Sequence, residues 1–392
     1  MVEDVVETFR EYLKIRSVHP EPDYDGCIEF VKKRADQYGL KTQIFRLDEK
    51  RPVLIVTLEG SEPNLPSILL NSHTDVVPVF EDQWSYDPFG AEMDEEGNIY
   101  ARGSQDMKCV TIAHLEALRR IKFSQVKLKR TVHMTLLPDE ELGSIEGMAK
   151  FVHTKTFKDL NVGFDIDEGI PTPDEEFMIY NNERCKWGVL IHCTGTTGHG
   201  SLLHENTAGE KLRIVIDKFM DLRKREAVKF QTEPHLGDIT TVNLTQIQGG
   251  IQNNVMPPEI IVGFDLRIKA DGDHEEMEKW INDVCKEAGE GVYPEYIQKD
   301  IKVPATVLCS KNPFWTSMET TLKSLGLKYN VRSLFGATDA RFARGVGVSA
   351  VGFSAFNHTP TRLHDNNECM NKNIFLAGIS IYEHLVKSVA NV

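Results

Sequence analysis

The chain has 392 residues, of which 41% are hydrophobic and 27% charged, and this is the composition of an ordinary globular protein with two domains. Its formal net charge of −14 makes nucleic acid an unexpected partner, and no stretch approaches the roughly 18 apolar residues that a membrane span needs. An acidic start, and seven cysteines without a Cys-x-x-Cys pair, lead us to expect a cytoplasmic protein with reduced thiols.

The first part of the chain alternates helical and extended patterns. Apolar residues at helical spacing predict the helices 2–13, 24–38, 107–121 and 144–151. Short apolar runs predict the strands 67–70, 131–137 and 162–166. Strands that alternate with helices indicate an α/β sheet with helices on both faces.

The pattern changes after about residue 182. The next elements are expected in the order strand, helix, strand, strand, helix, strand, over residues 188–194, 206–223, 238–247, 259–268, 274–288 and 293–297. This order is the ferredoxin-like βαββαβ arrangement. Beyond residue 302 the α/β pattern resumes, with helices over 314–325 and 372–389 and strands near 332 and over 349–354.

We therefore predict an α/β/α catalytic domain in two parts, 1–183 and 303–392. A ferredoxin-like lid or dimerisation domain is expected as an insertion over 184–302.

Four motifs follow predicted strands or open a predicted helix. The carboxyl ends of strands in an open α/β sheet form the crevice that binds ligands, so we expect these motifs to converge. The motifs are His73-Thr74-Asp75, the segment from Arg102 to Asp106, Pro138-Asp139-Glu140-Glu141 and Asp167-Glu168-Gly169, and a late Leu363-His364-Asp365 completes the set.

The residue types in these motifs suit a site for two divalent metal ions. Two neutral imidazoles and three carboxylates can hold two ions about 3.5–4 Å apart if one carboxylate bridges them. One member of the pair Glu140 and Glu141 is then free to act as a base. Asp75, two residues after His73, can hold the second ring N–H. Each residue alone has an ordinary explanation, such as a helix N-cap for Asp106, but their joint order and position favour the metal site.

With these motifs the chain resembles the zinc aminoacylases (N-acyl-L-amino-acid amidohydrolases). Their family includes glutamate carboxypeptidase, carnosinase-type dipeptidases and succinyl-diaminopimelate desuccinylase. The resemblance covers nearly the whole chain, and its most specific motifs are His73 to Pro78, Arg102 to Lys108 and Pro138 to Glu141. The segments Gly336 to Arg341 and Leu363 to Asp365 point to the aminoacylase branch.

The resemblance implies roles for individual residues. One zinc ion would be held by His73, Asp106 and Glu168, and a second by Asp106, Glu141 and His364. Glu140 would be the general base, and Asp75 would orient His73. Ser144 stands where relatives often have a second glycine after the Glu-Glu pair, beyond the ligands.

Four further residues are candidates for contact with the substrate. By itself, His199 in Gly198-His199-Gly200-Ser201 is a histidine of a glycine-rich surface loop. The resemblance implies that it crosses a dimer interface and polarises the scissile carbonyl in the partner's site. Asn254 resembles a substrate-binding asparagine. Arg267 resembles the arginine that binds the substrate carboxylate, although an ion pair with Asp265 is the alternative, and Arg341 is a second carboxylate-binding candidate.

We therefore expect zinc-dependent hydrolysis of N-acyl-L-amino acids, in which Glu140 takes a proton from a metal-activated water and delivers it to the leaving amine. A dipeptidase or carboxypeptidase with the same metals is the alternative. A non-catalytic zinc-binding interaction protein would not need Glu140. The expected partners are a small N-acyl-amino acid and a second copy that forms a homodimer through residues 184–302, with neither nucleic acid nor a membrane. Cys109 lacks a neighbouring histidine motif and is predicted to be a buried helix residue.

Overall fold

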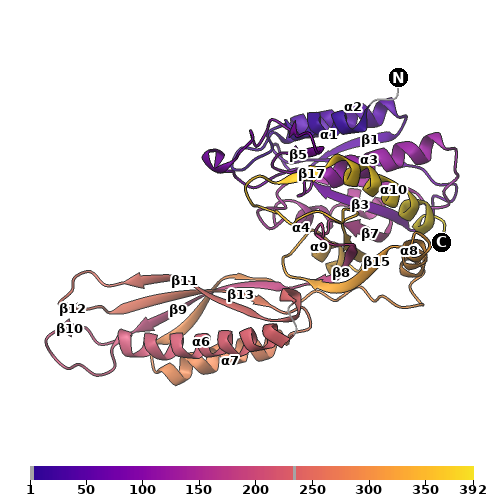
Figure 1. Ribbon diagram of the computed structural model, residues 1–392. Helices are drawn as coiled ribbons and strands as arrows, with labels where there is room; N and C mark the ends of the chain where they lie inside the picture. The colour runs from indigo at the N-terminus through magenta and orange to yellow at the C-terminus, as the bar shows by residue number, and fades with distance from the viewer. Residues whose placement is uncertain (1–3, 233–234) are drawn as a thin grey trace. The chain divides into compact units, whose positions relative to one another are not determined.

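The computed structural model describes residues 4–232 and 235–392. They form two compact units, and each interrupts the other along the chain (Figure 1). Unit 1 consists of residues up to Asn181, Pro304–Arg332 and Thr338–Val392, and unit 2 of Asn182–Val303 and Ser333–Ala337. The short segment Ser333–Ala337 groups with unit 2, which the sequence did not predict.

The centre of unit 1 is an eight-stranded sheet. Across the sheet its strands are β1 (Lys41–Arg46), β2 (Pro52–Leu58), β6 (Val132–Leu137), β3 (Ser67–His73), β7 (Val162–Asp167), β16 (Ser349–Phe353), β8 (Glu176–Glu183) and β15 (Lys328–Leu334). Strands β6, β3, β7 and β16 are parallel to one another, whereas β1 and β2 pair antiparallel at one side. The four parallel strands therefore end at the same edge, as an α/β sheet requires.

Helices cover both faces of this sheet, as predicted. One core contains Ile68 and Leu70 of β3, whereas Leu69 between them lies in the other, because successive side chains of a strand point to opposite faces. The first core packs against α1 (Val5–Leu13), α2 (Tyr24–Gln37), α3 (Lys108–Phe123), α8 (Pro313–Ser324) and α10 (Lys372–Val389). The second core packs against α4 (Met148–Phe151), α5 (Lys155–Asp159) and α9 (Ala340–Gly345).

Several of these helices begin at a side chain that accepts a backbone N–H of the first turn, and this capping explains where they start. The capping residues are Asp4 of α1, Asp23 of α2, Thr154 of α5, Asn312 of α8 and Asn371 of α10. The predicted start of the first helix at residue 2 lies outside the described residues.

The predicted helix over 144–151 is wrong in its first half, because α4 begins only at Met148. Gly143 and Ser144 both have positive φ, 92° and 62°, so the chain turns there instead of continuing as a helix. A Cβ on Gly147 would lie 2.1 Å from the Pro138 carbonyl oxygen, so this turn requires glycine. The turn keeps Glu140 and Glu141 at the sheet edge.

The loops of unit 1 carry a few small elements. They are the 3₁₀ helix η1 (Glu81–Gln83) and a three-stranded sheet of β17 (Cys369–Asn371), β5 (Asn98–Tyr100) and β4 (Glu92–Met93).

Unit 2 has the predicted ferredoxin-like fold. Its strands β9 (Cys185–Thr194), β11 (Thr241–Gly249), β13 (Glu259–Ile268) and β14 (Val292–Lys299) form an antiparallel sheet in the order β11-β13-β9-β14. Figure 1 shows α6 (Ala208–Thr232) and α7 (His274–Ala288) side by side along this sheet, and their apolar residues share one core with it. At the far end lie β10 (Gly198–His199) and β12 (Val255–Met256), and the 3₁₀ helix η2 (Leu236–Asp238) precedes β11.

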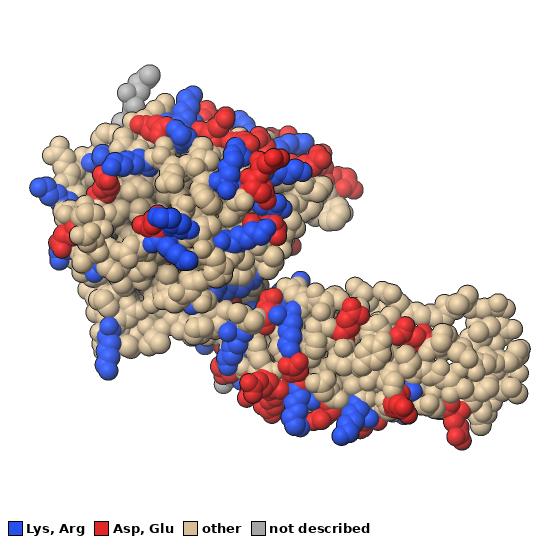
Figure 2. Space-filling view, turned by 180° about the vertical axis from the view of Figure 1, so that it is seen from behind, with Lys and Arg blue, Asp and Glu red and all other residues tan. Residues whose placement is uncertain are grey.

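Acidic and basic side chains are interspersed over the face seen in Figure 2. No disulfide joins any of the seven cysteines, all of which lie within the described residues. Among residues 4–232 and 235–392, no helix combines the length and apolar character that a membrane crossing requires.

Candidate metal centre

The candidate ligands meet at the edge of unit 1 where the parallel strands end. His73 is the last residue of β3, and Glu168 follows β7 directly. Asp106 lies two residues before α3, and Glu141 follows β6 in the turn described above. His364 comes from the loop between β16 and β17. The sheet thus gathers residues that lie far apart in the sequence.

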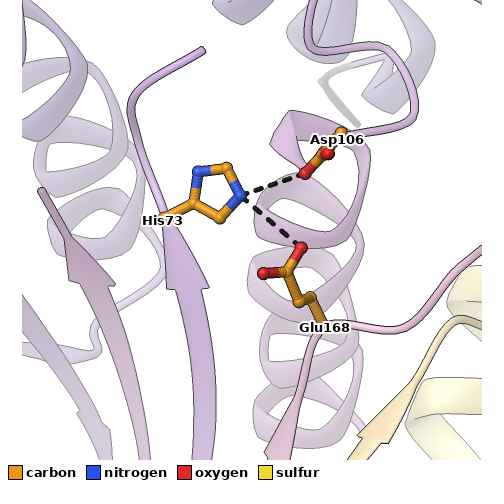
Figure 3. A group of neighbouring side chains, drawn as sticks. All are labelled: His73, Asp106 and Glu168. Atoms are coloured by element: carbon orange, nitrogen blue, oxygen red, sulfur yellow. Dashed lines mark hydrogen bonds and ion pairs between the residues drawn. The ribbon is translucent and has the colours of Figure 1, made fainter. Parts of the chain in front are cut away.

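The first group consists of His73, Asp106 and Glu168, all buried (Figure 3). The Nε2 atom of His73 lies 3.1 Å from Asp106 Oδ1 and 3.5 Å from Glu168 Oε2. Burial raises the pKa of Glu168 well above its usual value. The charge of His73 lowers this pKa, whereas the charge of Asp106 raises it further. A divalent cation would compensate the charge of these carboxylates.

The second group consists of Asp106, Glu141 and His364. The Nε2 atom of His364 lies 3.0 Å from Glu141 Oε2 and 3.3 Å from Asp106 Oδ2. Asp106 therefore directs one oxygen to each group, which is the arrangement of a bridging carboxylate. In each group the potential ligand atoms lie within 4.8 Å of one another, so the residues fit a pair of metal ions.

The neighbouring peptide orients the imidazole of His73. Its Nδ1 lies 3.0 Å from the backbone carbonyl oxygen of Asp75, so the N–H donates there and Nε2 keeps a free lone pair. The sequence predicted the Asp75 carboxylate in this role, but its Oδ1 is farther away, at 3.7 Å. That carboxylate instead accepts the N–H groups of Glu140 and Glu141, at 3.2 and 3.0 Å.

Glu140 belongs to neither ligand group. Its Oε2 lies 3.9 Å from His73 Nε2, so the carboxylate faces the centre without being needed as a ligand. Burial and the nearby charge of Glu168 raise the pKa of Glu140 well above its usual value. A carboxylate with a raised pKa beside a metal site is suited to accept and return a proton.

Asp167 precedes Glu168 but belongs to neither ligand group, and its carboxylate accepts from Asn71 Nδ2 at 3.1 Å. The same amide donates to Asp339 at 3.1 Å. Burial, together with the charge of Asp167, raises the pKa of Asp339 to about 7.

No motif in the sequence singles out Glu368. Its buried carboxylate pairs with Arg102 and accepts the N–H groups of Gly103, Gln105 and Asp106, at 3.1, 2.5 and 3.2 Å. Glu368 thus shapes the loop that presents Asp106. No short motif contains both partners, so the pattern of the sequence could not have revealed this contact.

Asp139 was also missed. Its carboxylate accepts the Tyr24 hydroxyl at 2.6 Å and pairs with Arg51. The Tyr24 hydroxyl oxygen in turn accepts the N–H of Asp139 at 3.0 Å. These contacts anchor the start of the turn that carries Glu140.

Two of the predicted substrate-binding residues lie together at the far end of unit 2. His199 is exposed, and β10 pairs with β12, so that His199 lies opposite Val255. The N–H of Gly200 donates to the carbonyl of Asn254 at 2.8 Å, which joins the two loops. His199 Nδ1 lies 2.8 Å from the Ser201 hydroxyl, which leaves Nε2 available.

Arg267 and Arg341 lie elsewhere. Arg267 pairs with Asp265, with Nε 2.8 Å from Oδ1, which is the alternative that the sequence left open. It sits opposite Lys186, near the place where the chain enters unit 2. From Glu259 to Arg267 is eight residues of β13, or about 26 Å, so Arg267 is far from the His199 end. Arg341, in unit 1, donates to the Gly143 carbonyl at 2.7 Å.

Cys109 is buried in α3, as the sequence predicts, and burial raises the pKa of its thiol well above the usual value. It is therefore unsuited to be a nucleophile.

Comparisons with known proteins agree on one family. Residues 69–388 match Peptidase family M20/M25/M40. Aminoacylase-1 of Mus musculus is 44% identical over 389 residues, covering 99% of this chain and 95% of that protein. Aminoacylase-1 of Dictyostelium discoideum is 40% identical, covering 98% of this chain and 97% of that protein. The solved M20 family metallo-carboxypeptidase Sso-CP2 from Sulfolobus solfataricus has the same fold, with a TM-score of 0.77, 18% identity, and coverage of 99% of this chain and 100% of that one.

Proposed function

The chain belongs to peptidase family M20/M25/M40, and from that premise we propose that it hydrolyses the amide bond of N-acyl-L-amino acids. The observation that carries the proposal is the pair of ligand groups that share Asp106, with Glu140 beside them and free of both. The identity to the aminoacylases, which extends over nearly the whole chain, favours this substrate class over peptides.

Two zinc ions per chain suit the ligand set, which offers imidazole nitrogens and carboxylate oxygens. The first would be held by His73, Asp106 and Glu168, and the second by Asp106, Glu141 and His364. Such ions would supply Lewis acidity, which polarises an amide carbonyl and lowers the pKa of a bound water. Elemental analysis of the active enzyme tests the count, and one ion per chain at full activity would contradict it.

Glu140 is the general base of this proposal. Its carboxylate removes a proton from the attacking water and then delivers it to the amide nitrogen as the amine leaves. The turn that presents Glu140 is held by backbone donors to the Asp75 carboxylate, which keeps the base in place during both transfers.

The substrate carboxylate needs a cationic partner, and we assign this role to Arg267, with Arg341 as a second candidate. A guanidinium can bind a carboxylate through two parallel hydrogen bonds. Arg267 donates to Asp265 through Nε and Nη2, at 2.8 and 3.3 Å, and a substrate carboxylate could approach the Nη1 side of the guanidinium.

We further propose that the chain forms a homodimer through unit 2 and that His199 completes the partner's site. The far end of unit 2 carries exposed apolar side chains beside His199, namely Leu202, Leu203, Ile251 and Val255. The same end is mostly uncharged in Figure 2, which suits burial against another protein surface. His199 would donate a hydrogen bond to the oxyanion, a contact typically worth about 3–4 kcal/mol of barrier.

A substrate panel tests the proposed activity. N-acetyl-L-amino acids, dipeptides and N-acetylated D-amino acids are offered to the enzyme, with and without a chelator. We expect hydrolysis of the N-acetyl-L-amino acids, and loss of this activity with the chelator. Preferential cleavage of dipeptides would identify a dipeptidase instead, and no cleavage at all by metal-loaded protein would contradict an enzymatic function.

A further inference from the structure

We propose that His19 is a positioning residue of the metal centre, which holds the Asp75 carboxylate where it can fix the turn of Glu140 and Glu141. This inference rests on the proposed function for its kinetic consequences, but its structural consequences can be measured without substrate. His19 lies in the loop between α1 and α2, far from every motif that defines the metal centre in the sequence.

The Asp75 carboxylate is the junction through which His19 would act. It is fully buried, and its two oxygens accept the N–H groups of Glu140 and Glu141. Oδ1 also lies 3.7 Å from His73 Nδ1. One carboxylate therefore touches a ligand of the first group, a ligand of the second group and the base, so a rotation of its plane would disturb all three.

His19 supplies the remaining contact of that carboxylate. Its Nε2 lies 2.9 Å from Asp75 Oδ2, and only 8% of its side chain is exposed. The backbone strengthens the connection, because the N–H of His19 donates to the Val76 carbonyl at 3.3 Å and the N–H of Val76 donates to the Ser17 carbonyl at 3.0 Å. The loop of His19 is thus fastened to the segment that carries Asp75 by main chain and side chain together.

The electrostatics of the pair agree with this geometry. Burial alone would lower the pKa of His19, but the hydrogen bond and charge of Asp75, with smaller effects of Asp139 and Glu141, raise it. A charged imidazolium beside a charged carboxylate makes a hydrogen bond roughly twice as strong as a neutral one.

The surroundings of His19 provide a way to test its role by chemical rescue. His19 lines a cavity of about 480 Å³, together with Tyr24, Arg51, Asp139 and Leu142. Removal of the imidazole would enlarge this cavity up to the Asp75 carboxylate. A small solute such as imidazole can then reach the place of the lost side chain.

Three variants separate the hydrogen bond from the volume of the side chain. His19→Ala removes both, His19→Leu keeps a comparable volume without a donor, and His19→Gln keeps a donor at similar reach. In His19→Ala and His19→Leu we expect kcat to fall and chelator-driven metal release to accelerate by about 10–100-fold, the usual effect of losing a residue that orients a metal site. KM should change far less than kcat, because His19 contacts Asp75 and belongs to neither ligand group. His19→Gln should recover most of the wild-type values.

Two further measurements complete the test. Added imidazole should raise the activity of His19→Ala, relative to wild type at the same imidazole concentration, but not that of His19→Leu, whose side chain fills the space. In metal-free protein, hydrogen exchange of the peptide spanning residues 138–147 should accelerate in His19→Ala and His19→Leu and stay slow in His19→Gln, because the N–H groups of Glu140 and Glu141 lose a fixed acceptor.

The outcomes distinguish this inference from the proposed activity. If His19→Leu releases metal as slowly as wild type, and the amides of residues 138–147 exchange as slowly as in wild type, the inference is wrong, whatever the substrate proves to be. If the enzyme cleaves no N-acyl-amino acid but the metal release and exchange change as expected, the proposed function fails and the role of His19 stands. If His19→Ala does not fold, the comparison of His19→Leu with His19→Gln decides.

Discussion

Arg102 Nη1 lies 2.6 Å from Glu368 Oε2, and the two side chains are only 2% and 0% exposed. This buried ion pair joins the start of the Arg102–Asp106 loop to a residue just before β17. Glu368 also accepts N–H groups of the loop. It therefore balances the charge of Arg102 and also fixes the backbone that presents Asp106.

Glu368→Gln should therefore destabilise the protein strongly. The change leaves the Arg102 guanidinium buried without a counter-charge, and breaking such a pair typically costs about 3–5 kcal/mol. Denaturant unfolding of metal-free protein measures the loss. The matched control is Asp159→Asn, which breaks the exposed pair of Asp159 with Lys155 and should leave stability nearly unchanged. Equal, small effects of the two changes would contradict the role assigned to Glu368.

Glu140→Gln and Glu141→Gln should have different effects, although the two residues are adjacent. Glu140 lies outside both ligand groups, so Glu140→Gln should lower kcat by roughly 10²–10⁴ and leave the metal content close to wild type. Glu141 belongs to the second group, so Glu141→Gln should lose metal. Steady-state kinetics and elemental analysis on the same preparations check both. Near-normal kcat in Glu140→Gln would show that another group is the base.

Metal binding should weaken as the pH falls. Hydrogen bonds from His364 to Asp106 and Glu141 raise the pKa of His364 to about 10 in the metal-free protein, and burial raises the pKa of Glu141. At any pH below about 10, a metal must displace the His364 proton before it can bind. The affinity should therefore rise with pH by up to about tenfold per pH unit for each proton displaced.

Calorimetric titration of metal-free protein with zinc, in buffers with different heats of ionisation, measures the protons released. His364→Gln, which cannot carry a proton, should release fewer protons and bind the second ion more weakly. Binding that is independent of pH between 6 and 8 would show that the imidazole is already neutral.

Activity should return when two inactive variants are mixed. His199→Ala and Glu140→Gln should each form a nearly inactive dimer, but a mixed dimer would have one site with both residues intact. Half of the dimers are mixed after complete exchange of equal amounts, and one of their two sites is whole, so about a quarter of the wild-type activity should return. Exchange is verified separately by differently tagged chains. If exchange occurs without recovery, His199 acts in its own chain or not at all.

The positions of His199, Asn254 and Arg267 within unit 2 allow further mixing experiments. His199 and Asn254 lie on joined loops and should serve the same site, so mixing His199→Ala with Asn254→Ala should restore nothing. Arg267 lies at the other end of β13, near the entry of the chain into unit 2, and should serve the site of its own chain. His199→Ala mixed with Arg267→Ala should therefore recover activity, whereas Glu140→Gln mixed with Arg267→Ala should not.

Much of the fold could be predicted from local patterns. The bounds of β13, α7 and α10 agree with the predicted ranges 259–268, 274–288 and 372–389, because their apolar periodicity is strong and their ends carry clear signals. β1 was not predicted, because four of its six residues are polar and most are exposed, and only its pairing with β2 makes it a strand. An edge strand depends on pairing with its neighbour, which the pattern of its own residues does not contain.

The candidate ligands could also be predicted, because all have the chemistry of a metal ligand and all but His364 follow a strand end or open a helix. The residues that support them could not. Glu368 lies 266 residues from Arg102, and His19 lies 56 residues from Asp75. Polar residues in loops are common, and only the folded chain selects those that meet.

The interrupted order of the chain in unit 1 has a consequence for biosynthesis. Unit 2 is nearly continuous in sequence, and all of it is synthesised before β16, the strand that lies between β7 and β8 in the large sheet. Domains generally fold as units during synthesis. We therefore expect the inserted unit to fold early, whereas the eight-stranded sheet of unit 1 can be completed only after β16 has been synthesised. The second ligand group is completed last, because its member His364 is translated only after β16. A nascent chain without His364 has the first ligand group but not the second, so we expect activity to appear only when translation is almost complete.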